Sequence, residues 1–169
     1  MKWFIYLIVA ITYSCSSHKS PIYVEIAHDI TEKTAKKLDT EKELHLIGTG
    51  GGMMHNVRMM AMSFRYHHPI NIDQGRELLM SAVNEYLLAI NSNEQIRPYL
   101  VSDPFEPKNV EIAIFISNPD GSPVAKGDIC VISENQGILQ YDTRDPKTNH
   151  LTKIHEESYE QALQKLDLH

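Results

Sequence analysis

The chain has 169 residues, of which 42% are hydrophobic and 22% charged, and its net charge is −6. These values are typical of a globular domain and exclude a largely disordered or fibrous chain. The lysines and arginines are scattered along an acidic sequence, so it lacks the basic surface that a phosphate backbone requires. We therefore expect no nucleic-acid partner.

The first fifteen residues have the pattern of an export signal. Lys2 precedes an unbroken apolar stretch from Trp3 to Ile11, and mostly small or polar residues lead from there to Cys15. This stretch is much shorter than the roughly 20 residues that a membrane-spanning helix needs. It matches the apolar core of a secretory signal. We expect residues 1–14 to be a signal peptide.

The end of this segment resembles the signal class of bacterial lipoproteins, in which the chain is cut before a cysteine that then receives fatty acid. The pair Ser14-Cys15 carries the resemblance, because a small residue precedes the lipidated cysteine in that class. It implies that acylated Cys15 holds the protein on a membrane of the cell envelope, the outer membrane in a Gram-negative cell, with residues 15–20 as a tether. More than one acyl chain gives stable anchoring. Cleavage by an ordinary signal peptidase and an uncleaved N-terminal anchor remain alternatives.

Residues 21–169 are expected to form a single α+β domain, and the first half of this range gives the weaker signals. Alternating apolar residues in Ile22–Ile26 favour a short strand, and a capping-box pattern then predicts a helix from about Ile30 to Ile47. The glycine-rich run 48–52 is expected to be an irregular connection. A methionine-rich strand is predicted at Met54–Tyr66.

The second half gives clearer patterns. Asp73 is a candidate N-cap for a helix over Gln74–Asn91, whose apolar residues recur at helical spacing. Strict alternation predicts a strand at Val110–Ile116, and this helix is expected to cover its isoleucine face. The remaining predicted elements are strands at about Ala125–Ser133 and Ile138–Tyr141 and a helix at about Glu156–Leu166. Short turns make the last three strands antiparallel. We expect an antiparallel sheet of about four strands with helices mainly on one face.

No local motif indicates catalysis, a metal or a cofactor. The glycine run lies between a predicted helix and a predicted strand, the reverse of a phosphate-binding loop. The nine histidines show no ligand spacing typical of zinc sites, and Cys130 lies in an apolar strand, as a buried thiol does. A Gly-x-Ser-x-Gly elbow is absent from the sequence. We therefore assign no catalytic residue, metal ligand or cofactor from the sequence.

A proline-containing loop between Arg97 and Asn109 is the candidate binding segment. Long loops in small domains are often functional. Tyr99 and Phe105 are candidate partner contacts, with the alternative that both seal the edge of the sheet.

The export signal, together with the missing catalytic motif, predicts a non-catalytic envelope lipoprotein that binds a protein partner or a surface component. One alternative is an envelope hydrolase whose site is assembled from dispersed His, Asp and Glu residues. Another is a carrier of a small ligand. Two histidines and a carboxylate converging in a pocket would favour the hydrolase.

Overall fold

The computed structural model describes residues 20–167. The expected signal peptide, residues 1–14, and Cys15 lie outside the described residues. The helices are α1 (Ile22–Lys42), α2 (Ile72–Asn91) and α3 (Tyr159–Leu166), with 3₁₀ turns at Arg97–Tyr99 and Pro107–Asn109. The strands are β1 (His45–Gly52), β2 (Met59–Tyr66), β3 (Val110–Ile116), β4 (Ile129–Asn135), β5 (Ile138–Arg144) and β6 (Leu151–Ser158).

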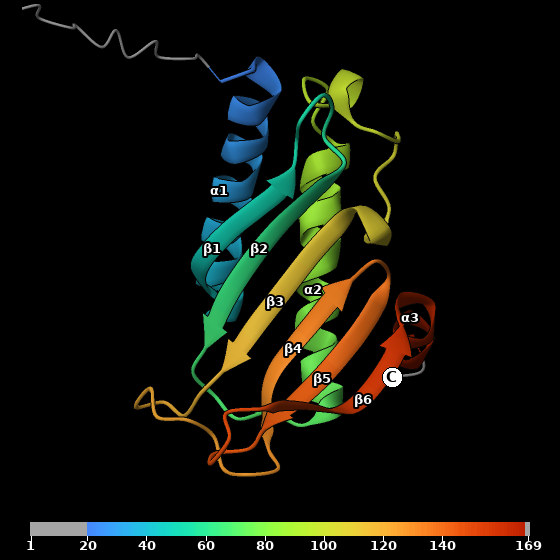
Figure 1. The fold of residues 1–169 in the computed structure, drawn as a ribbon. Coiled ribbons are helices and arrows are strands. Elements are labelled where there is room, and N and C mark those ends of the chain that lie inside the picture. The colour runs from blue at the N-terminus through green and yellow to red at the C-terminus, as the bar shows by residue number, and fades with distance from the viewer. Residues whose placement is uncertain (1–19, 168–169) are drawn as a thin grey trace, which may run out of the picture.

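The described strands form one sheet in which they lie side by side in chain order, β1 to β6 (Figure 1). Neighbouring strands are antiparallel with the exception of β2 and β3, which are parallel. The parallel pair arises because α2 leads the chain from the end of β2 back along the sheet to the start of β3. A parallel pair needs such a crossover, whereas the antiparallel pairs are joined by connections without an intervening helix, from the turn 136–137 to the longer loop 117–128.

The described helices all lie on the same face of the sheet (Figure 1). The core lies between these two layers. It contains the inward-facing side chains of the central strands, Met60, Met62, Phe64, Val110, Ile112, Ile114, Ile132, Leu139 and Tyr141. From α2 it receives Leu79, Val83, Tyr86 and Ile90, which confirms that this helix packs on the isoleucine face of β3. The α+β class and the placement of the helices are thus confirmed.

The prediction for the start of the domain was wrong. Ile22–Ile26 belongs to α1 and is not a strand, and the helix ends at Lys42 instead of Ile47. The buried residues of α1 follow the helical period as Ala27, Ile30, Thr31, Thr34, Ala35 and Leu38. Tyr23 and Ile26 extend this stripe by one turn and pack against the core. The apolar alternation in Ile22–Ile26 therefore belongs to the start of an amphipathic helix.

The glycine-rich run 48–52 is also regular structure, contrary to the prediction. It lies within β1 and pairs with β2 from Gly48 opposite Ser63 to Gly52 opposite Met59. At Gly51 an added Cβ would stand 2.9 Å from the carbonyl oxygen of Met59, so close packing of backbone requires a residue without a side chain there.

The sheet has six strands rather than about four, and it is mixed rather than wholly antiparallel. The additional strands are β1 and β6. The strand β6 occupies residues that the prediction left as a loop or placed in the C-terminal helix, which begins only at Tyr159. The N-cap of α2 is Asn71 and not Asp73, with a capping box closed by Gln74.

Candidate functional site

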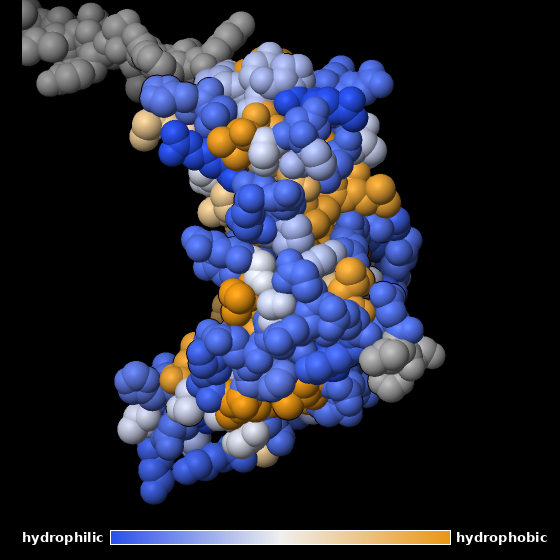
Figure 2. Space-filling model, turned by 90° about the vertical axis from the view of Figure 1, so that its right-hand side faces the viewer, coloured by the Kyte–Doolittle hydropathy of each residue, from blue (hydrophilic) through white to orange (hydrophobic). Residues whose placement is uncertain are grey.

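No described helix covers the second face of the sheet, which we call the open face. Strand alternation places on it the residues that lie between the buried ones, such as Ala61 on β2 and Ala113 on β3. In Figure 2 this face forms the left-hand side of the molecule, and the outline there is concave. The sheet is therefore hollowed on the side that its helices leave free.

The centre of the open face carries few charges. An antiparallel sheet with one solvated face normally alternates apolar and polar residues, with the polar ones outward. Here the outward residues of β2, β3 and β4 include Met59, Ala61, Ser63, Ala113, Phe115, Ser133 and the buried Val131, and the charged residues Glu111 and Arg65 lie near the strand ends. Phe115 is 38% exposed. By contrast, the edge strand β6 presents the charged residues Lys153 and Glu156. The central strands thus offer a smooth and mostly uncharged surface.

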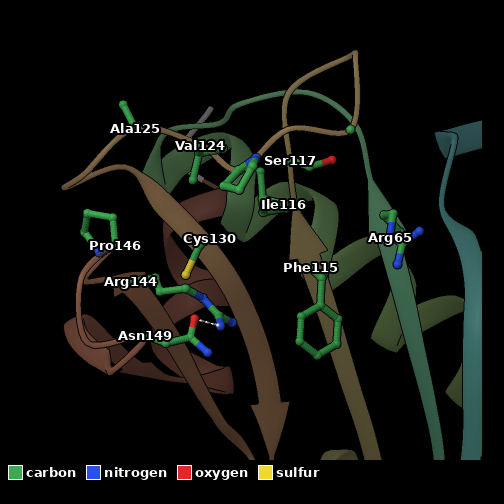
Figure 3. Close-up of a pocket in the computed structure, with 12 residues that line it drawn as sticks. Arg65, Phe115, Ile116, Ser117, Val124, Ala125, Cys130, Arg144, Pro146 and Asn149 are labelled. Atoms are coloured by element: carbon green, nitrogen blue, oxygen red, sulfur yellow. Dashed lines mark hydrogen bonds between the residues drawn. The ribbon is translucent and has the colours of Figure 1, made fainter.

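A cavity of about 310 Å³ lies at one end of the open face (Figure 3). Its walls come from the end of β3, from β4 and β5 and from the loops that follow β3 and β5. The apolar lining consists of Phe115, Ile116, Pro123, Val124, Ala125 and Pro146. The polar lining includes Arg65, Ser117, Arg144 and Asn149. A few polar groups in an apolar cavity are typical of ligand sites.

The cavity is positively charged although the protein is acidic. Its lining contains Arg65 and Arg144 but no carboxylate. Within residues 20–167, neither arginine forms an ion pair; Arg144 donates a hydrogen bond to Asn149 Oδ1 at 2.7 Å (Figure 3). Of the nearby acids, Asp145 pairs with Lys126 at 3.6 Å. Asp142 accepts hydrogen bonds from the neutral side chain of Gln140 and keeps its charge, but it does not line the cavity.

Cys130 lies at the wall of this cavity, in an irregular pairing between β4 and β5, and its side chain is 8% exposed. Burial raises the pKa of its thiol, and the neighbouring Arg144 guanidinium opposes that rise only in part. The thiol is therefore protonated at neutral pH, whereas a nucleophilic cysteine reacts as the thiolate. The burial of Cys130 agrees with the expectation from its apolar strand.

Histidines that the sequence analysis treated singly meet beside the start of β1. His45 Nδ1 lies 2.6 Å from Asp39 Oδ1, and the rings of His45 and His67 have centroids 5.7 Å apart. His67 Nδ1 in turn lies 2.8 Å from Ser117 Oγ. A Ser-His-Asp triad needs the carboxylate on the histidine that contacts the serine. Here Asp39 contacts the other histidine, so the four side chains form two separate pairs.

Within the described part of the chain, no group of three or more His, Cys, Asp or Glu side chains is arranged to share a metal ion. Among residues 20–167, none of the helices combines the length and the apolarity that crossing a membrane requires.

Tyr99 and Phe105, the two candidate contacts of the proline-containing loop, differ in exposure. Phe105 is 3% exposed and belongs to the core, and its backbone N–H donates to Asn91 Oδ1 at 2.8 Å. Its side chain therefore has almost no surface to offer to a partner. Tyr99 is half-buried, with its ring 5.4 Å from that of Tyr23 on α1. This loop is fastened to the helical layer and does not lie on the open face.

Comparisons of the chain with protein-family models, with curated proteins and with solved structures find no match.

Proposed function

We propose that this protein is a non-catalytic, membrane-anchored envelope lipoprotein that binds a protein partner through the open face of its sheet. The observation that carries the proposal is the low charge at the centre of that face, where Ala61, Ser63 and Ala113 stand in place of the long polar side chains of an ordinary solvated sheet. A concave surface of small side chains lets another backbone or a convex surface approach closely. Exposed apolar side chains such as Phe115, which is 38% exposed, add to this contact surface.

The N-terminal segment supports the membrane part of the proposal. A lipidated Cys15 and the tether 15–20 directly precede α1, which begins at Ile22. So short a tether keeps the domain near the membrane surface, where other envelope proteins are concentrated. The test is a Cys15→Ser variant followed through membrane fractionation, with mass spectrometry of the mature N-terminus. We expect an acylated cysteine in the native protein and release of the variant from the membrane.

Partner binding is tested with two matched variants. Ala113→Glu places a charge on the open face, and Leu88→Glu places one on the solvent side of α2, where Leu88 is 62% exposed. Each variant is cross-linked in cells and purified from detergent-solubilised membranes. We expect the wild type and Leu88→Glu to recover the same stoichiometric partner and Ala113→Glu to lose it. Equal recovery by all three proteins would contradict the role of the open face.

A second candidate function is an envelope hydrolase, and the contact between Ser117 and His67 is the observation that favours it. In this mechanism His67 accepts the proton of the Ser117 hydroxyl as its oxygen attacks the acyl carbon, and passes that proton to the leaving group as the acyl bond of the substrate breaks. Water then cleaves the acyl-serine ester and restores the free hydroxyl. A fluorophosphonate probe tests it, because such probes label activated serines. Labelling that disappears in Ser117→Ala would establish the hydrolase, whereas an unlabelled native protein removes it.

A further inference from the structure

The cavity beside Phe115 combines two properties that a single ligand must match. Its walls are apolar, with Phe115, Val124 and Pro146 among them, and its charged groups are Arg65 and Arg144. Figure 3 shows the Phe115 ring between the two arginines, with the Arg144 guanidinium extending toward Phe115 and Asn149 lying beside it. A ligand that fills it therefore has an apolar group close to a negative charge.

The guanidinium groups are available for such a ligand. A guanidinium carries five N–H donors, and within residues 20–167 the only side-chain oxygen bonded to Arg144 is Asn149 Oδ1. Arg65 is exposed and has no carboxylate partner in the same range. An arginine pairs well with a carboxylate because its planar fork matches the two oxygens. Because no acid lines the cavity, neither arginine has a carboxylate partner there among residues 20–167.

We propose that the cavity binds a carboxylate next to an apolar side chain, presented by a segment of the partner protein that lies along the open face. This inference rests on the proposed function and names the chemistry of the partner. The carboxylate pairs with Arg144 and is attracted by Arg65, while the apolar side chain packs on Phe115 and Val124. The cavity volume of about 310 Å³ is near the lower limit for small-ligand sites, so it accommodates one side chain with its carboxylate.

The continuity of the cavity with the open face favours a peptide over an isolated small molecule. Phe115 lines the cavity, and its neighbour on the same side of β3 is Ala113, at the centre of that face. A chain anchored in the cavity can therefore continue over the smooth surface formed by β2, β3 and β4. One carboxylate-containing anchor then fixes the position of a segment that otherwise contacts small side chains.

The test is isothermal titration of the full mature protein in detergent with N-acetylphenylalanine, which carries a carboxylate next to an apolar ring. The matched probe is N-acetylphenylalaninamide, which has the same shape without the charge. We expect the acid to bind at least about tenfold more tightly than the amide, since charge-assisted hydrogen bonds to Arg144 are lost in the amide. Equal binding of both probes, or binding of neither, would overturn the proposal.

Variants assign the binding to this cavity. Arg144→Gln is expected to weaken binding of the acid about tenfold, and Arg144→Lys, which keeps the charge, to weaken it less. Arg58→Gln is the control, because Arg58 also lacks an ion pair within residues 20–167 and lies outside the cavity lining. Unchanged binding by Arg144→Gln, with a native circular dichroism spectrum, would place the probe elsewhere and refute the site.

Two further probes distinguish the source of the charge. If phenyl phosphate binds more tightly than the acid, the natural ligand carries a phosphate group, and the carboxylate proposal is wrong. Vesicles of phosphatidylglycerol that displace the acid would make a lipid surface the ligand and contradict the peptide. If Ala113→Glu abolishes partner recovery while Arg144→Gln does not, the proposed function stands and the cavity inference falls.

Discussion

Arg76 Nε donates a hydrogen bond of 2.7 Å to Glu157 Oε1, and both side chains are almost fully buried. This pair joins α2 to the last residues of β6. Tyr141 Oη donates to the same carboxylate oxygen at 2.9 Å, and Lys165 on α3 donates to Oε2 at 2.6 Å. One carboxylate therefore connects the central helix, the edge strand and the C-terminal helix.

The variant Glu157→Gln tests how much this connection contributes to the free energy of unfolding. Glu157→Gln removes the buried carboxylate from Arg76, whose remaining carboxylate partner is the exposed Asp73. Breaking a buried ion pair typically costs about 3–5 kcal/mol of unfolding free energy. The measurement is urea unfolding at neutral pH. Glu156→Gln is the matched control, because Glu156 is exposed on the other side of β6, and its free energy should stay within about 0.5 kcal/mol of the wild type.

The same carboxylate makes the free energy of unfolding depend on pH in the acidic range. Although burial opposes it, hydrogen bonding and charge interaction with Arg76, together with the hydrogen bonds from Lys165 and Tyr141, lower the pKa of Glu157 from 4.5 to about 2. The stabilisation is complete above pH 4.5 and is lost as the pH falls from 4.5 to about 2. Unfolding free energies measured between pH 6 and pH 2 should fall more steeply for the wild type than for Glu157→Gln. Parallel curves would show that the carboxylate is not held by these contacts.

Glu134 shows the opposite pH dependence. Its side chain is fully buried, and burial raises the pKa of its carboxyl to about 8, although the N–H of Gly137 donates to Oε1 at 2.7 Å. An acid whose pKa is raised on folding costs stability as the pH rises from 4.5 to 8, by about 1.4 kcal/mol per pH unit. We expect Glu134→Gln to flatten this decline in denaturant unfolding between pH 5 and 8. Glu94→Gln, at an exposed position, should retain the wild-type slope.

The glycines of β1 are expected to differ in their tolerance of a side chain. A Cβ at Gly50 would stand 3.6 Å from Ala61 Cβ, an ordinary contact, whereas one at Gly51 would meet the Met59 carbonyl oxygen at 2.9 Å. Gly50→Ala should therefore stabilise the protein by about 0.5–1 kcal/mol, because alanine loses less backbone freedom on folding. Gly51→Ala should destabilise it by about 1–2 kcal/mol. Thermal unfolding of the two variants side by side measures the difference, and an equal effect would contradict the close packing.

The sequence predicts α2 and β3 well because their burial follows their own residue pattern. The apolar stripe of Leu79, Val83 and Tyr86 faces the core, as does the alternating set in β3. The strand β1 could not be predicted in this way, because glycines carry no pattern and the strand exists through pairing with β2. The strand β6 has mostly exposed side chains and polar residues, so its sequence gives no apolar alternation to detect.

The cavity could not be found from the sequence for a topological reason. Arg65 lies one residue before the end of β2, and Arg144 ends β5. They share a cavity only because β2, β3, β4 and β5 lie side by side. The parallel pairing of β2 with β3 brings Arg65 opposite Phe115, the residue between the two arginines. A prediction that does not give the order of the strands cannot show that these residues are neighbours.

Site-specific photo-cross-linking in intact cells tests the central claim most directly. A benzophenone side chain is placed at Phe115 on the open face in one protein and at Leu88 on the outside of α2 in another, each in the full-length chain. The account predicts a discrete cross-linked product of constant mass from position 115 and none from position 88. Products from position 88 alone, or the same products from both positions, would contradict a partner on the open face.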